Sequence, residues 1–190
     1  MAGFRATVLV VASSVVAVVA AGAGVRAQGR PTQRAVHAGH AARADSTVVN
    51  EFMTYNAAAK RVTIKLIAAL GSANGGMNFN GRSRGDLTIT VPVGWQVRMP
   101  FENKDAIPHS AIVLANKFPL PLTPDAPAIA RAYTNEVTAG LPTGGTDVLD
   151  FKAAPAGSYL IVCGVPGHAP SGMYIKFVVS ATAKVPNYGS

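Results

Sequence analysis

The sequence has one cysteine, few charges and few aromatic side chains, and these shortages exclude several classes of protein. Cys163 is the only thiol among 190 residues, so a disulfide framework, a cysteine-rich zinc site and a cysteinyl iron–sulfur cluster are excluded. Charged residues make up 14% of the chain and apolar residues 49%, which favours a packed core over a disordered chain. Thirteen prolines and nineteen glycines disfavour a helical bundle and favour short strands joined by turns.

The N-terminal segment carries no charge for twenty residues after Arg5. The strongly apolar part of residues 6–25 has the length of a signal-peptide hydrophobic region, and small residues at Ala21–Ala23 and Val25–Ala27 offer cleavage sites. Residues 1–27 are therefore predicted to be a signal peptide. A retained membrane anchor is the alternative, because twenty uncharged residues can also cross a bilayer. Both interpretations predict export to the periplasm or the outer face of the membrane.

Residues 28–46 have the composition of a flexible basic linker, with three arginines, two histidines and almost no large apolar side chain. His37 and His40 are interpreted as part of this solvated spacer rather than as a metal site. Residues 1–45 contain five of the seventeen basic residues and one of the nine acidic ones, so the net charge falls from +8 to +4 without them. The remaining basic residues form no stripe with aromatic side chains, and nucleic acid is not a predicted partner.

Residues 47–190 are predicted to form one all-β domain. Apolar and polar residues alternate at 61–69, 87–91 and 95–101, and further strands are expected at 110–115, 146–152, 157–163 and 173–180. The segments 87–91 and 95–101 flank a Pro-Val-Gly break and are expected to pair antiparallel. The pattern predicts an antiparallel Greek-key β-sandwich of seven or eight strands. Residues 116–142 contain five prolines and are expected to form a long surface excursion with a helical turn at 125–132.

The chemically informative residues lie between the last two predicted strands. Cys163 closes the inner face of one strand, Met173 opens the inner face of the next, and His168 lies midway in the loop between them. His109 stands at the start of another strand. Taken singly, each side chain is better explained as an ordinary core or surface residue. Together, the domain's only cysteine and only two histidines, with a methionine at ligand spacing, match a type 1 (blue) copper site with a weak axial thioether.

At these residues the chain resembles the cupredoxins, small blue copper proteins, and within them the sulfocyanins most, with rusticyanin a more distant relative. The resemblance covers residues 48–180 and rests on four motifs: Asn78–Gly81, Val91–Trp95, Ile107–Ser110 and the Cys163-x4-His168-x4-Met173 loop. It implies that His109, Cys163, His168 and Met173 bind one copper ion. It also implies a monomeric one-electron carrier, not an enzyme, whose partners are redox proteins such as cytochromes or terminal oxidases.

Three further expectations concern the surroundings of the site. Residues 153–190 contain no Asp or Glu, so the site is expected to be neutral and to favour Cu(I). Gly164 is expected to leave space beside the sulfur, where a backbone N–H can donate to the thiolate. The side chains of Pro166, Ala169 and Pro170 are expected to form an uncharged docking patch around the edge of His168.

Three alternatives compete with electron transfer. An exported copper-binding or delivery protein is the alternative kept open, although delivery favours exposed, exchangeable ligands such as methionine clusters, and the other methionines are dispersed. A copper enzyme is disfavoured, because no further histidine remains in the domain for a second copper centre. A hydrolase is disfavoured, because no acid near Cys163 and His168 in the sequence can orient the imidazole.

Overall fold

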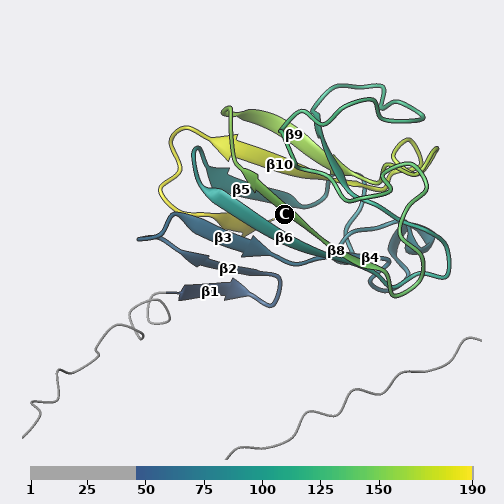
Figure 1. Ribbon diagram of the computed structural model, residues 1–190, viewed down its shortest axis with the longest axis horizontal. Helices are drawn as coiled ribbons and strands as arrows, with labels where there is room; N and C mark the ends of the chain where they lie inside the picture. The colour runs from purple at the N-terminus through teal and green to yellow at the C-terminus, as the bar shows by residue number, and fades with distance from the viewer. Residues whose placement is uncertain (1–45, 190) are drawn as a thin grey trace, which may run out of the picture. The chain divides into compact units, whose positions relative to one another are not determined.

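Two β-sheets face each other across a shared apolar core in the computed structural model of the chain, which describes residues 46–189 (Figure 1). One sheet contains β1 (Ser46–Asn50), β2 (Met53–Asn56), β3 (Arg61–Ile64), β4 (Leu66–Ala68), β6 (Gln96–Asn103) and β8 (Thr146–Lys152). The other contains β5 (Thr88–Pro92), β7 (Ile112–Ala115), β9 (Gly157–Val162), β10 (Tyr174–Ser180) and β11 (Asn187–Gly189). A short 3-10 turn, η1, covers Ala73–Gly76. The predicted all-β sandwich is confirmed.

The sheets are mixed, which corrects the expectation of wholly antiparallel pairing. The six-stranded sheet has the order β1-β2-β3-β6-β4, with β8 on β6, and the other has the order β11-β5-β10-β9-β7. β10 runs parallel to β5, and β3 and β4 both run parallel to β6, along its first and second halves. Eleven strands are present among the described residues, instead of seven or eight. The three that the sequence analysis missed, β1, β2 and β11, are short.

The predicted pairing of β5 with β6 is wrong, because the two strands belong to different sheets. Their alternation was read correctly: β6 buries every second side chain, and so does β5 up to its last residue. At the turn between them, Val93 N–H donates to Ser180 O of one sheet, and Gly94 N–H donates to Ala153 O beside the other, each at 2.8 Å. The Pro-Val-Gly segment therefore carries the chain from one sheet to the other. Alternation identifies the buried face of a strand but not its neighbour.

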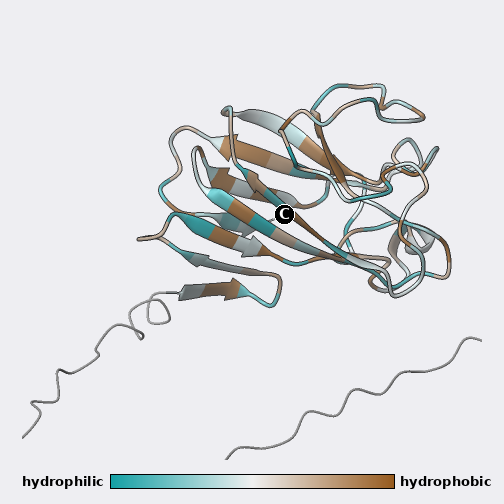
Figure 2. Ribbon diagram, viewed as in Figure 1, coloured by the Kyte–Doolittle hydropathy of each residue, from teal (hydrophilic) through white to brown (hydrophobic). Residues whose placement is uncertain are grey.

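Hydrophobic residues, coloured brown in Figure 2, lie along the central strands of both sheets. The side chains of the inner faces form one cluster that runs from Met53 to Val179. The predicted inner-face residues of β9 and β10 all belong to this cluster, and so do Cys163 and Met173, which flank the loop between these strands. A second cluster covers the outer face of β7 and β9 and contains Ile112, Leu114, Leu160, Val162 and Ala169. These two strands are therefore buried on both sides.

Residues 116–142 form the predicted long excursion but no helix, so the helical turn expected at 125–132 is wrong. This segment instead runs along the free edge of β7. Ala128 N–H donates to Val113 O at 2.8 Å, Val113 N–H donates to Ala132 O at 2.9 Å, and Thr134 N–H donates to Ala111 O at 2.8 Å. The excursion thus satisfies the backbone groups of an edge strand, which would otherwise remain open to pairing with another chain.

The predicted leader and linker lie outside the described residues, apart from Ser46, the first residue of β1. Within residues 46–189, no helix is long and apolar enough to cross a membrane.

Candidate metal centre

Two connections at one end of the sandwich carry the predicted site residues: the segment before β7 carries His109, and the loop between β9 and β10 carries the other three. His109 lies just before β7 and is bridged to Leu141 by two backbone hydrogen bonds of 3.2 and 2.8 Å. Cys163 follows β9 directly, and its N–H donates to the carbonyl of Met173, the residue before β10, at 3.0 Å. His168 lies in the loop between Cys163 and Met173. Backbone hydrogen bonds on both sides of each connection therefore fix the positions of the Cα atoms from which these side chains extend.

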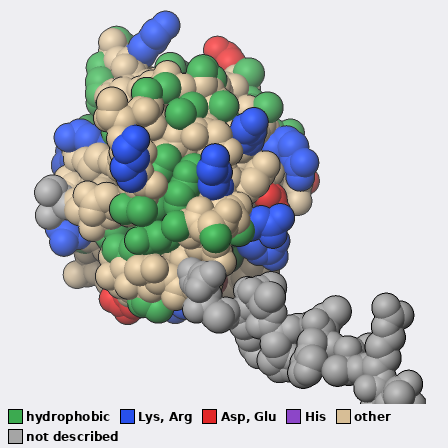
Figure 3. Space-filling model, turned by 90° about the vertical axis from the view of Figure 1, so that its left-hand side faces the viewer, with side chains coloured by type: hydrophobic (Ala, Val, Ile, Leu, Met, Phe, Trp, Pro, Cys, Tyr) green, Lys and Arg blue, Asp and Glu red, His purple; other side chains and the backbone are tan. Residues whose placement is uncertain are grey.

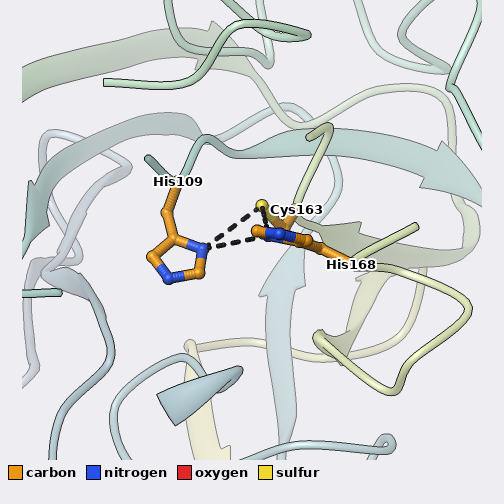
Figure 4. A group of neighbouring side chains, drawn as sticks. All are labelled: His109, Cys163 and His168. Atoms are coloured by element: carbon orange, nitrogen blue, oxygen red, sulfur yellow. Dashed lines mark hydrogen bonds between the residues drawn. The ribbon is translucent and has the colours of Figure 1, made fainter. Parts of the chain in front are cut away.

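The nitrogen and sulfur atoms of His109, Cys163 and His168 converge on a small triangle (Figure 4). The Cys163 Sγ atom lies 3.7 Å from His109 Nδ1 and 3.4 Å from His168 Nδ1, and the two Nδ1 atoms are 3.2 Å apart. Metal–nitrogen and metal–sulfur bonds of about 2.0 and 2.3 Å would place three donors of a planar site about 3.5–3.7 Å apart. The triangle therefore has the size that a single metal ion requires.

Met173 lies beside this triangle through its backbone. Its N–H donates to His168 O and its carbonyl accepts from Cys163 N–H, both at 3.0 Å, and its side chain is fully buried. The thioether is thus held in the core at the same end of the sandwich. Its role as the axial ligand stays a prediction.

Asp105 is a site residue that the sequence analysis missed. Its carboxylate Oδ2 lies 2.9 Å from His109 Nε2, and the His109 side chain is fully buried. The hydrogen bond with His109 is the main reason why the pKa of Asp105 is lower than usual. The expectation of a site without a nearby acid was drawn from residues 153–190 alone and is wrong, because this carboxylate comes from another connection. Its position four residues before His109 was the only signal in the sequence.

Residues 48–189 match the sulfocyanin (SoxE) domain family. The chain is 30% identical to sulfocyanin from Sulfolobus acidocaldarius over 139 residues, which cover 70% of each protein. The chain belongs to the sulfocyanin family of cupredoxins. Crystal structures of two rusticyanin variants share the fold, one at 24% identity and a TM-score of 0.51, covering 72% of this chain and 88% of that one. The other shows 22% identity and a TM-score of 0.50, with 72% and 87% covered.

Sulfocyanins and the other cupredoxins hold one type 1 copper ion and transfer electrons rather than catalyse a reaction. The donor triangle of this sulfocyanin-family chain fits that ion by its chemistry as well as by its size. A thiolate stabilises Cu(I), and imidazole nitrogens bind both oxidation states. Among the described residues, His109, Cys163 and His168 form a group of the kind that could hold the copper.

The environment of Cys163 raises the pKa of its thiol. Burial is the main reason why its pKa is raised, and a hydrogen bond from Ser110 N–H to Cys163 Sγ, at 3.5 Å, partly opposes this effect. The predicted N–H beside the sulfur is therefore supplied by Ser110. Gly164 serves a different purpose: its N–H donates to Ser110 Oγ at 2.9 Å, and Ser110 Oγ donates to Val137 O at 2.6 Å. The cysteine loop, the start of β7 and the long excursion are tied together at this point.

His168 is only half-buried, and its pKa is lowered, first by burial and then by repulsion from His109. The exposed apolar side chains near this end of the sandwich include Ile107, Phe118 and Leu122. Leu122 lies against the loop, since its carbonyl accepts from Gly167 N–H at 2.9 Å.

The predicted docking patch needs one correction. Ala169 is 2% exposed and packs in the outer-face cluster, so its side chain cannot face a partner, whereas Pro166 and Pro170 are exposed as expected. Trp95 and Phe101 are core residues.

Proposed function

We propose that this protein is a mononuclear type 1 copper protein that carries single electrons between redox proteins outside the cytoplasm, in a respiratory or similar chain. The donor triangle of His109, Cys163 and His168 is the observation that carries the proposal. Copper bound there would supply the Cu(I)/Cu(II) couple. The buried side chain of Met173 is proposed as the axial ligand.

The chain's own contribution is to hold the donors in one arrangement and to exclude water. Cys163, His109 and Met173 are fully buried, and each is fixed by backbone hydrogen bonds to a neighbouring strand or loop. A rigid donor set limits the rearrangement that accompanies a change of copper charge. Half-buried His168 is the ligand nearest to solvent, so its ring edge is the proposed contact with a partner such as a cytochrome or terminal oxidase.

β1 begins at the end of the sandwich away from the proposed copper ligands. Strand register places Ser46 opposite Asn56, Asn56 opposite Arg61, and Arg61 opposite Gln96, at the end of the sandwich away from His109 and Cys163. The chain therefore enters the described domain at the end opposite the proposed copper ligands. The end that carries Ser46 shows apolar side chains bordered by Lys and Arg (Figure 3). Val93 and Val185 are the large exposed apolar residues of its turns.

The burial of the donors also weighs against copper delivery. A delivery protein exchanges its metal by ligand substitution at accessible donors, whereas three of the four proposed ligands here are inaccessible to solvent. The delivery alternative is therefore less well supported than electron transfer. The rate at which bound copper is released to a competing chelator separates the two functions, and we expect this release to be slow compared with electron transfer.

The test is an optical and EPR spectrum of the purified protein after addition of one equivalent of Cu(II). Intense visible absorption with a narrow copper hyperfine splitting, bleached reversibly by ascorbate, is expected, because the thiolate donates charge to Cu(II). Cys163→Ser should abolish this absorption, whereas Met99→Leu, a change in the core away from the site, should leave it intact. A pale solution with an ordinary copper EPR signal from the unmodified protein would refute the proposal.

Export is tested separately. The N-terminal residue of the protein recovered from the membrane and soluble fractions of its native cells distinguishes a cleaved leader from a retained anchor. Recovery from the cytoplasm with Met1 in place would contradict export.

A further inference from the structure

The carboxylate of Asp105 is held in place from several directions. Asp105 Oδ1 accepts a hydrogen bond from Ala106 N–H at 2.7 Å, and Asp105 N–H donates to Asn103 Oδ1 at 2.8 Å. Asn103, the last residue of β6, is fully buried, and its amide donates to Ile107 O at 2.8 Å and to Leu141 O at 2.9 Å. The turn that carries Asp105 is therefore anchored in the core rather than free to move with solvent.

The facing loop also leaves room for the carboxylate. A Cβ atom added at Gly76 would lie 3.1 Å from Asp105 Oδ2, so a side chain at this position would crowd the oxygen that meets His109. Gly76 has a φ of +91°, which other residues rarely adopt. The Asp105 side chain is 25% exposed. Its carboxylate thus occupies a defined place between η1 and the His109 ring.

We propose that Asp105 is a positioning residue of the copper site, which fixes the tautomer of His109 and, by its negative charge, lowers the reduction potential. The proposal rests on the proposed function. A neutral imidazole carries one proton, on either nitrogen. With Oδ2 at 2.9 Å from Nε2, the proton stays on Nε2, and the lone pair of Nδ1 faces Cys163 Sγ and His168 Nδ1. A carboxylate behind a metal-bound histidine has this effect in other metal sites.

The negative charge of Asp105 also affects the reduction potential, which a hydrogen bond to a neutral group would do much less. A carboxylate separated from the metal by one imidazole ring stabilises Cu(II) more than Cu(I), because the doubly charged ion is attracted more strongly. Its side chain is mostly shielded from solvent, so the attraction is only partly screened. We expect removal of the charge to change the ratio of Cu(II) to Cu(I) affinities about tenfold, which for one electron corresponds to about 59 mV.

Two variants separate the tautomer from the charge. Asp105→Asn keeps an oxygen that can accept from Nε2–H but removes the charge, and Asp105→Ala removes both. Asp150→Asn is the control, because Asp150 is a half-exposed acid on β8, paired with Arg98 at 3.6 Å and remote from the donor triangle. Reduction potentials are measured by spectroelectrochemistry, and the His109 tautomer is read from ¹⁵N chemical shifts of the metal-free protein.

The expected results differ for each variant. Asp105→Asn should keep the Nε2–H tautomer and raise the potential by about the amount that a tenfold affinity ratio gives. Asp105→Ala should raise the potential as well and yield a mixture of His109 tautomers. Asp150→Asn should change neither quantity. A potential of Asp105→Asn equal to that of Asp150→Asn would overturn the charge effect, and a single Nε2–H tautomer in Asp105→Ala would overturn the tautomer effect.

The design also separates failure of this proposal from failure of the proposed function. If the unmodified protein gives no blue copper spectrum, the proposed function fails, whereas the ¹⁵N measurement on metal-free protein still decides the tautomer. If Asp105→Ala does not fold, Asp105→Asn, which retains both the size and the acceptor oxygen, still tests the charge effect on the potential.

Discussion

Gly164→Ala tests how the long excursion is packed against the cysteine loop. A Cβ atom at residue 164 would overlap the side chain of Val137 and would lie 2.9 Å from Val137 O and 3.1 Å from Ser110 Oγ. The φ of Gly164 lies outside the left-handed region, so alanine is allowed by the backbone and only the contacts are changed. Overpacking of this kind costs about 1–3 kcal/mol. For a domain of this size, the melting temperature should fall by about 2–12 °C.

The assay is thermal and urea unfolding of the metal-free protein, with Gly189→Ala as the control. Gly189 also has no left-handed φ, and its added Cβ would meet only Asn187 Nδ2, at an ordinary 3.6 Å. Combining Gly164→Ala with Val137→Ala should recover part of the loss, since the overlapping methyl group is removed while the carbonyl contact remains. Stability of Gly164→Ala within about 0.5 kcal/mol of the unmodified protein would refute the reasoning, because a surface change has effects of that size.

Two further predictions concern the axial thioether and the C-terminal strand. Met173→Leu should leave the visible absorption largely intact and raise the reduction potential, because loss of a weak donor destabilises Cu(II) more than Cu(I). Met99→Leu, equally buried, should leave the potential unchanged, and a fall in potential in Met173→Leu would mean that Met173 is not axial. Burial raises the pKa of Tyr188 above its ordinary value of about 10, so the folded state holds this proton more tightly than the unfolded state. The free energy of unfolding should therefore fall as pH rises above about 10, and it should fall less in Tyr188→Phe than in the unmodified protein. Urea titrations at pH 9 and pH 11 measure this fall, and an equal fall in the two proteins would contradict the prediction.

The cysteine loop was predictable from the sequence because its information is local. Alternation on either side of the loop assigns Cys163 and Met173 to inner faces, and the spacing of His168 between them is visible without knowledge of the fold. The structure confirms these inner faces and brings His109 to the same place, as the sequence analysis expected. His109 was proposed because it is the domain's only other imidazole, stands at the start of a strand and lies in the Ile107–Ser110 motif that resembles the cupredoxins.

The contacts that surround the donors were not predictable, because most of them join segments far apart in the chain and one lies within an irregular turn. Asp105 was passed over because it lies in a turn without periodicity, where the sequence does not show that its carboxylate faces the His109 ring. Ala169 was expected at the surface, but it is covered by an outer-face cluster that includes Leu120 and Val137 of the excursion. Gly164 was expected to leave space beside the Cys163 sulfur, whereas its lack of a side chain makes room for Val137. In each case the deciding neighbour is more than twenty residues away or in a turn without periodicity.

By itself, the amino-acid sequence determined that this protein is an all-β domain with a single thiol, two imidazoles and a thioether at the spacing of a copper site. Composition and short-range periodicity suffice for that, because side-chain direction alternates along any strand whatever its partner. Tertiary structure alone decided which sheet each strand joins, that Ser110 N–H donates to the Cys163 sulfur, and that a carboxylate lies behind His109. These features depend on which segments pack together, and that choice is made by the whole core rather than by any local pattern.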